Sequence, residues 1–205
     1  MDVVNKASEF FDKHIRIVKN AGYLIAGIGV FMIVRRSRLF TKFNVASDIP
    51  EDFIQKRIKL RGIVQNVCTN STLHVEHIPS MSYPAATIVR RFQKQLDNNG
   101  LISLDMAGVS MNDVGIDLVK GEIEGKAVWF ELLNHVEKDQ NAPAVIYRRK
   151  YAILRNYNIY VVKMGYGAVD NVPNCYHLKV QQSLQRSLLK AQKKAAIKKR
   201  GIWKD

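Results

Sequence analysis

The sequence predicts an α+β protein in which an N-terminal transmembrane helix precedes a small β-barrel with helices on its outside. Three observations support this fold class. An uncharged apolar run comes first, short segments of alternating polar and apolar residues follow it, and the chain ends in a long basic amphipathic helix. Hydrophobic residues make up 47% of the chain, which is enough to build a packed core and excludes a largely disordered protein.

The uncharged run extends over residues 21–34. Its fourteen residues are too few to cross ~30 Å of hydrocarbon as a helix. Starting the helix at Ile15 gives the ~20 residues that a span requires, because Arg16 and Lys19 can extend their charged ends to the membrane surface. We therefore expect a transmembrane helix with a basic flank over residues 15–38.

Three other interpretations of this run fit its sequence less well. A cleaved signal peptide needs a small-residue cleavage site after its apolar core, but here the core continues into Arg35 and Arg36. A buried core helix suits the length, but the run is apolar on all sides. A helix lying flat in the interface would show a polar face, and residues 21–34 have none. A single membrane span fits the pattern best.

Small residues line one face of this helix. Gly22, Ala26 and Gly29 follow a spacing that places them together and allows a second helix to approach closely. The pattern predicts self-association through the helix. The alternative is that small residues are simply common in membrane helices.

The flanks of the run favour the mitochondrial inner membrane as its location. Basic residues stand on both sides of a short, moderately apolar segment, and the acidic residues of the leading segment, 1–14, argue against a cleaved transit peptide. The endoplasmic reticulum and the plasma membrane are the alternatives. Charge on both flanks leaves the orientation undetermined.

The rest of the chain is expected to comprise a linker over residues 39–56, marked by the breakers Ser47, Asp48 and Pro50, and one domain over residues 57–205. Alternation of apolar and polar residues predicts strands in this domain. They are expected near residues 58–64, 73–75, 104–108, 127–133 and 145–154.

Two helices are expected toward the C-terminus. Asn158 is a candidate N-cap for a short helix over Ile159–Met164, which Gly165 would end. A long helix over 178–199 would turn one apolar face inward, formed by Leu184, Leu188, Ala191 and Ala195. Strands followed by outer helices fit a small barrel of the OB type.

Four segments of residues 57–205 resemble the staphylococcal nuclease family. They read TNST at 69–72, LDMAGVSMND at 104–113, NIYVVKMGYG at 158–167 and LLKAQKKAAIKKRGIW at 188–203, in the order in which the family has them. The resemblance implies a staphylococcal-nuclease-like (SNase-like) OB-fold barrel. With the preceding apolar helix, the chain resembles an animal family of single-span membrane proteins that carry such a domain.

In nucleases of this family, carboxylates hold a calcium ion, another carboxylate activates water and arginines steady the phosphate. The resemblance places Ser71 and Ser110 at the two ligand positions, and Asp105 where an arginine would stand. Asp113 replaces the water-activating glutamate with a shorter acid. Because calcium prefers carboxylate oxygens, these departures predict a chain that binds neither metal nor cofactor and is not an enzyme. Arg148 and Arg149 are candidates for the second family arginine.

The histidines offer no alternative metal site. His74 and His77 are three residues apart on an expected strand, so they would point to opposite faces and are expected to be surface residues.

The formal net charge of +14 favours anionic partners, which include nucleic acid, acidic lipid and acidic protein. The candidate anion-binding residues are Arg90, Arg91, Lys94, Arg148, Arg149, Lys190, Lys193, Lys194, Lys198, Lys199 and Arg200. On a helix, positions 190, 194 and 198 align into a stripe that could follow phosphates. The alternative is a solvated basic face.

These observations predict an interaction or scaffold module, without catalytic activity, that organises a region of membrane. A nucleic-acid-binding module tethered to a membrane is the second hypothesis, because OB surfaces bind single strands through basic grooves. A calcium-dependent nuclease is the third and the least favoured.

Overall fold

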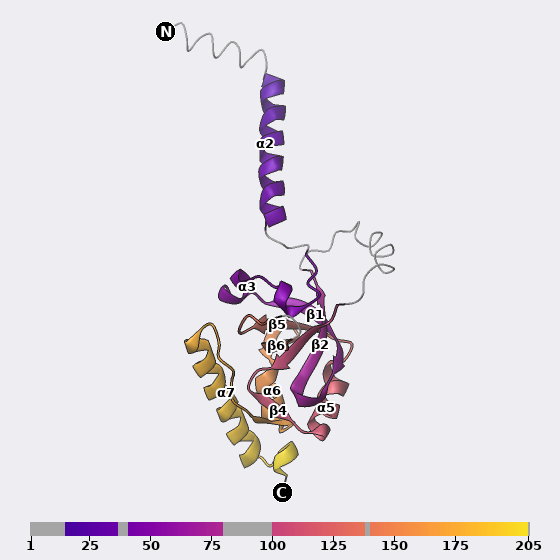
Figure 1. Ribbon diagram of the computed structural model, residues 1–205, viewed down its shortest axis with the longest axis vertical. Coiled ribbons are helices and arrows are strands. Elements are labelled where there is room, and N and C mark those ends of the chain that lie inside the picture. Colours follow the sequence, from indigo (N-terminus) through magenta and orange to yellow (C-terminus); the bar gives the residue numbers. More distant parts are fainter. Residues whose placement is uncertain (1–14, 37–40, 80–99, 138–139, 205) are drawn as a thin grey trace. The chain divides into compact units, whose positions relative to one another are not determined.

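The computed structural model describes residues 15–36, 41–79, 100–137 and 140–204. The chain divides into two compact units, Met1–Thr41 and Lys42–Asp205 (Figure 1). The first unit contributes one described helix, and the second contains the β-barrel and all the remaining elements.

The helix of the first unit, α2, extends from Ile15 to Arg36. A helix is therefore present where the sequence predicted one. Its large apolar side chains are exposed, with Leu24, Ile25 and Phe31 all more than 60% accessible. The predicted membrane span is not found, because no helix within the described ranges is both long and apolar enough to cross a membrane.

Five strands of the second unit form a closed barrel. Four antiparallel pairs join them in the order β3 (Ile102–Met106), β2 (Thr72–Ile78), β1 (Leu60–Val67), β5 (Ala127–Leu132) and β6 (Ala142–Lys150). A parallel pairing of β3 with β6 closes the ring. The expected small barrel is thus confirmed.

The alternation seen in the sequence decides which side chains fill this barrel. In β1 the residues Leu60, Val64 and Val67 are buried, and in β3 every second residue is buried. Successive side chains of a strand point to opposite faces, so the apolar set faces the interior and the polar set faces outward. The strand β7 (Ile153–Asn156) extends the sheet beyond β6, and β4 (Val109–Met111) pairs with β8 (Gly167–Val169) as a separate ribbon.

Besides the short helix α3 (Glu51–Gln55), three longer helices accompany the barrel (Figure 1). They are α5 (Asp113–Ile123), α6 (Tyr157–Met164) and α7 (Leu178–Ile197). The sequence predicted α6 and α7, and the buried face of α7 is the expected one, formed by Leu184, Leu188, Ala191 and Ala195. It did not predict α5, whose first turn contains Asp113 and whose N-cap is Asn112.

Two glycines from the resembling segments meet in the folded chain. Gly165 ends α6 in the left-handed conformation (φ 75°), as predicted, and its carbonyl oxygen accepts a hydrogen bond from the backbone N–H of Ile202. A Cβ atom at Gly201 would collide with the backbone of Gly165. Both positions therefore require glycine, since α6 and the segment after α7 touch backbone to backbone.

The predicted linker over 39–56 is largely wrong. From Lys42 onward these residues belong to the compact domain, with a 3-10 turn η1 (Ala46–Asp48) and a short helix α3 (Glu51–Gln55). Phe43, Ile49 and Ile54 are buried in the core. The breakers that suggested a linker instead shape turns that bring these apolar side chains onto the barrel.

His77 is also buried, contrary to the expectation of a surface residue. Its ring lies 5.0 Å from that of Phe43, and its Nδ1 accepts a hydrogen bond from the backbone N–H of Phe43. Burial lowers the pKa of His77 to about 4, so the ring is neutral at physiological pH. His74 does point to the opposite face, as predicted.

Asn158 has a different role from the predicted N-cap. The cap of α6 is Asn156, whose Oδ1 accepts from the Ile159 backbone N–H. Asn158 is fully buried and bonds three backbone groups: its Nδ2 donates to the carbonyls of Ala107 and Ala144, and its Oδ1 accepts from Ile146 N–H. It therefore joins α6 to the end of β3 and to β6.

We expect Asn158→Ala to lower the free energy of unfolding by ~3 kcal/mol or more, because each buried polar group left without a partner costs ~1–3 kcal/mol. Asn156→Ala is the matched control: it removes a cap near the protein surface and should cost only ~1 kcal/mol. Urea unfolding followed by circular dichroism measures both variants. Equal losses would contradict the assigned role of Asn158.

Candidate functional site

The four positions that the resemblance assigns to a nuclease site gather at one end of the barrel. Ser71 ends the turn η2 (Thr69–Ser71) and Asp105 lies in β3. Ser110 is in β4 and Asp113 begins α5. One hydrogen bond joins η2 to β4, and another joins β2 to β3.

Ser71 is buried and its hydroxyl is occupied by the protein. Its Oγ accepts a hydrogen bond of 3.0 Å from the backbone N–H of Met111, in β4. The residue is 1% exposed and has a left-handed backbone (φ 64°), which is uncommon for a serine. The side chain thus fastens η2 to β4 rather than facing an open site.

Asp105 is bound by a neighbouring strand in a similar way. The register pairs it with Thr72 of β2, and its Oδ1 accepts a hydrogen bond of 2.6 Å from the Thr72 hydroxyl. The same Thr72 oxygen accepts a weaker bond, of 3.4 Å, from the amide of Asn141. These two hydrogen bonds link β2 to β3 and to the residue just before β6.

Ser110 and Asp113 are exposed. Ser110 faces outward from β4, between two buried residues. Asp113 follows the N-cap Asn112, whose Oδ1 accepts from Gly115 N–H. A negative charge in the first turn of a helix is stabilised by the helix dipole, so Asp113 already has a structural role.

Arg148 and Arg149, the candidate phosphate-binding arginines, do not face this site. In β6 the residue paired with Asp105 is Pro143, further back along the strand. Arg148 instead donates to Glu122 at 3.2 Å, and Arg149 is exposed beside Leu154 of β7. Within the described ranges, no group of three or more His, Cys, Asp or Glu residues could hold a metal ion.

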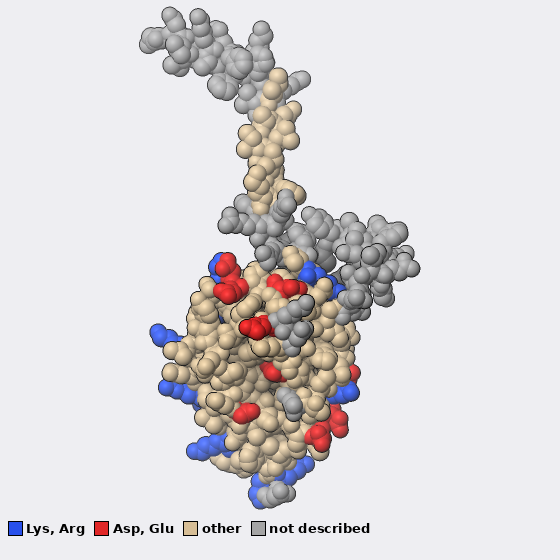
Figure 2. All heavy atoms as spheres, in the orientation of Figure 1, with Lys and Arg blue, Asp and Glu red and all other residues tan. Residues whose placement is uncertain are grey.

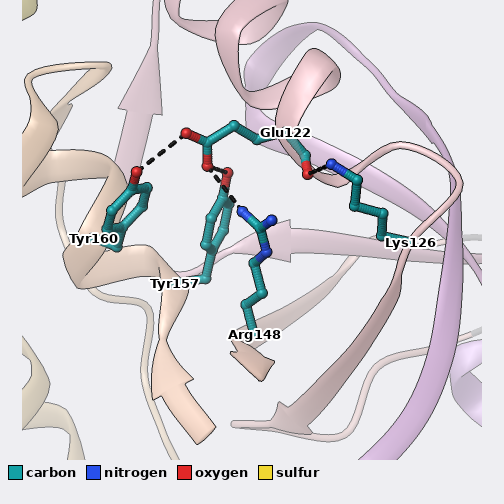
Figure 3. A network of polar contacts seen from close by, with 5 residues as sticks. All are labelled: Glu122, Lys126, Arg148, Tyr157 and Tyr160. Atoms are coloured by element: carbon teal, nitrogen blue, oxygen red, sulfur yellow. Dashed lines mark hydrogen bonds and ion pairs between the residues drawn. The ribbon is translucent and has the colours of Figure 1, made fainter. Parts of the chain in front are cut away.

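Glu122 is the centre of a polar network that sequence reasoning missed (Figure 3). Its carboxylate accepts hydrogen bonds from Arg148, from the Tyr157 hydroxyl at 3.0 Å and from the Tyr160 hydroxyl at 3.1 Å. Burial and the adjacent carboxylate raise the pKa of Tyr157 above its ordinary value. The network joins α5, β6 and α6.

Glu131 forms a second network deep in the barrel wall. Its side chain is 2% exposed, and it accepts hydrogen bonds from Arg57 at 2.6 Å and from Tyr147 at 3.0 Å. Burial raises the pKa of Tyr147 to about 12. No spacing in the sequence signals either network, because their members come from distant segments.

The basic residues of α7 lie on the outside of the domain. Helix α7 contains no acidic residue, and Lys and Arg side chains stand out along its edge of the domain (Figures 1 and 2). Of the predicted anion-binding residues in and just after α7, the exposed ones are Lys190, Lys193, Lys194, Lys198 and Lys199, and the basic residues Lys179 and Arg186 are exposed as well. Arg200 is half-buried, with a guanidinium nitrogen 3.9 Å from the Met164 sulfur.

Other predicted site residues remain predictions. Arg90, Arg91 and Lys94 lie outside the described residues. Gly22 and Gly29 have open space around them, so their use as a helix contact is untested.

Comparison with known proteins identifies the family. No family model matches the chain. The mouse "Protein C3orf33 homolog" is 31% identical over the whole chain, which spans 67% of that protein. The chain belongs to the C3orf33 family. The human member, "Protein C3orf33", is 30% identical over the same coverage.

A more distant relative bears on the C3orf33-family barrel. "Endonuclease Htp3" of Saprolegnia parasitica is 25% identical over 70% of the chain and 72% of its own length. Together with the five-stranded barrel and its outer helices, this match supports an SNase-like OB fold. Among solved structures, the extended Tudor domain of Drosophila melanogaster Tudor-SN matches with a TM-score of 0.41 and 13% identity, covering 69% of this chain and 67% of that one.

Proposed function

We propose that this C3orf33-family protein is a catalytically inactive interaction module that is held at a membrane. One observation carries the first half of the proposal. The oxygens at two of the nuclease positions already bond to the protein: Ser71 accepts from Met111 N–H, and Asp105 accepts from the Thr72 hydroxyl.

The electrostatics of this arrangement support inactivity. Phosphodiester cleavage needs positive charge beside the phosphate, which a metal ion and arginines supply. Here the hydroxyls of Ser71 and Ser110 are neutral, and Asp105 would repel a phosphate. A single lost stabilising group typically lowers the rate by ~10²–10³.

The membrane half of the proposal rests on α2. Its apolar side chains are exposed, and apolar area of this kind is stabilised by removal from water. We propose that α2 attaches the domain to a membrane and favour the mitochondrial inner membrane. Self-association through Gly22, Ala26 and Gly29 would gather copies of the protein into a patch there.

The purified protein is expected to show no calcium-dependent cleavage of DNA or RNA, because its site lacks the charges that such cleavage needs. Fluorescent single-stranded DNA and RNA, incubated with calcium or with a chelator, provide the measurement. Chelator-sensitive cleavage by the unmodified protein would make a nuclease the better interpretation.

A restoration series serves as the control. Ser71→Asp, Asp105→Arg, Ser110→Asp and Asp113→Glu together should recover weak activity, and no single change should. Because Asp105→Arg also removes the bond from Thr72, the combined variant must first be shown by circular dichroism to be folded.

We expect the protein to remain in the membrane fraction after alkaline carbonate extraction, and a variant lacking residues 15–38 to be released. The physical reason is the exposed apolar surface of α2. The matched variant Gly22→Leu with Ala26→Leu should stay in the membrane but crosslink less to itself. Release of the full-length protein by carbonate would contradict the attachment.

Nucleic-acid binding is the second candidate function, and the acid-free α7 favours it. Its lysines are exposed, and phosphate contacts need little more than properly spaced positive charge.

Changing Lys190, Lys194 and Lys198 together to glutamate should weaken binding to single-stranded DNA or RNA at low salt, and the parent should lose affinity steeply as salt rises. Fluorescence anisotropy measures both. Three exposed lysines elsewhere, Lys56, Lys120 and Lys163, supply a matched charge-reversal control. If the parent does not bind at low salt, α7 is only a solvated face.

A further inference from the structure

The hairpin formed by β6 and β7 exposes apolar side chains. Strand β7 stands at the end of the sheet and pairs with β6. Tyr151, in the turn, is 89% exposed, and Ile153 and Leu154 are 62% and 36% exposed. A protein surface seldom presents such a group together without a partner.

The turn also has an uncommon backbone. Tyr151 has a φ of 57°, in the left-handed region that bulky residues rarely adopt. The hairpin therefore holds an aromatic ring at its outermost point at some conformational cost. Strain of this kind is typical of binding segments.

Positive charge surrounds these apolar residues. Arg149, Lys150 and Arg155 are exposed, and β6 and β7 contain no acidic residue. The register places Arg155 directly opposite Arg148, and like charges facing each other across two strands are destabilising. Glu122 compensates Arg148, but the ion pairs found within the described ranges include none for Arg155.

This combination selects among anionic partners. A nucleic acid could stack a base on Tyr151 and contact the arginines, but it would leave Ile153 and Leu154 in water. A phospholipid surface accepts both groups, because its headgroups are anionic and its interface receives aromatic and aliphatic side chains.

We propose that the β6–β7 hairpin docks onto an anionic phospholipid membrane. Tyr151 and Ile153 enter the interface, while Arg149, Lys150 and Arg155 contact lipid phosphates. The inference rests on the proposed membrane setting, but it assigns the contact to a part of the chain other than α2 and other than the family's nuclease positions.

Hydrogen–deuterium exchange on the full chain tests the proposal. The protein is mixed with vesicles of phosphatidylcholine alone or of phosphatidylcholine with phosphatidylglycerol, and flotation first reports whether it is attached at all. We expect the amides of residues 149–155 to exchange severalfold more slowly on the anionic vesicles than on the neutral ones. Attachment to both kinds of vesicle would come from α2. Flotation therefore tests the proposed attachment through α2, and exchange of residues 149–155 tests docking of the hairpin.

Two variants and one control sharpen this test. Arg149→Glu with Lys150→Glu, and separately Tyr151→Ser with Ile153→Ser, should abolish the protection without lowering the melting temperature, since these side chains are exposed. Lys190→Glu with Lys194→Glu should keep it.

Three results would overturn the proposal. They are unchanged exchange on anionic vesicles that carry the protein, equal protection on neutral vesicles, and protection without lipid. In the last case, dependence on protein concentration would indicate a second copy of the chain, and dependence on added single-stranded DNA would indicate a nucleic acid.

Discussion

The barrel closes where β3 runs parallel to β6, and one buried side chain holds that closure. Asn158 donates to Ala107, which follows β3, and to Ala144 in β6, while it accepts from Ile146. A short parallel pairing has few hydrogen bonds of its own, and three more from a rigid amide fix its register. Since Asn158 belongs to α6, the same contacts also fix where α6 lies.

The geometry of the candidate site follows from this closure. The β3–β6 pairing places Asp105 beside Pro143, the β2–β3 register places it opposite Thr72, and the chain that turns from β3 into β4 brings Met111 to Ser71. A calcium nuclease needs free carboxylates at such a corner. Here the corner has short hydroxyl groups that bond within it.

Regular periodicity made most of this fold predictable. The strands, the buried face of α7 and the glycine that ends α6 all follow from local rules that need no knowledge of distant residues. Periodicity does not identify candidate site residues, but the resemblance to the nuclease family does. It pointed to Ser71, Asp105, Ser110 and Asp113, and the structure shows that the first two are hydrogen-bonded to neighbouring segments. The absence of nuclease activity stays a prediction.

The features that were missed depend on tertiary contacts. Phe43 and Ile49 stand in a short irregular segment whose breakers resemble those of a linker, and only the barrel surface shows that they are buried. His77 stands two residues after Val75 and so shares the buried face of β2, but only the contact with Phe43 shows how a polar ring is accommodated there. Glu122 and Glu131 collect partners that are distant in sequence.

The same networks fix where several acidic groups lie in this chain of net charge +14. The Glu131 carboxylate accepts hydrogen bonds from Arg57 and Tyr147. That of Glu122 accepts from Arg148 and two tyrosines, and that of Asp105 accepts from Thr72. Acidic groups held in this way sit beside their own donors and are poorly placed to neutralise α7 or the tip of the β6–β7 hairpin, which have no acids of their own. These two surfaces therefore carry positive charge that no acidic residue of their own elements offsets, and the anionic partners proposed above would contact them.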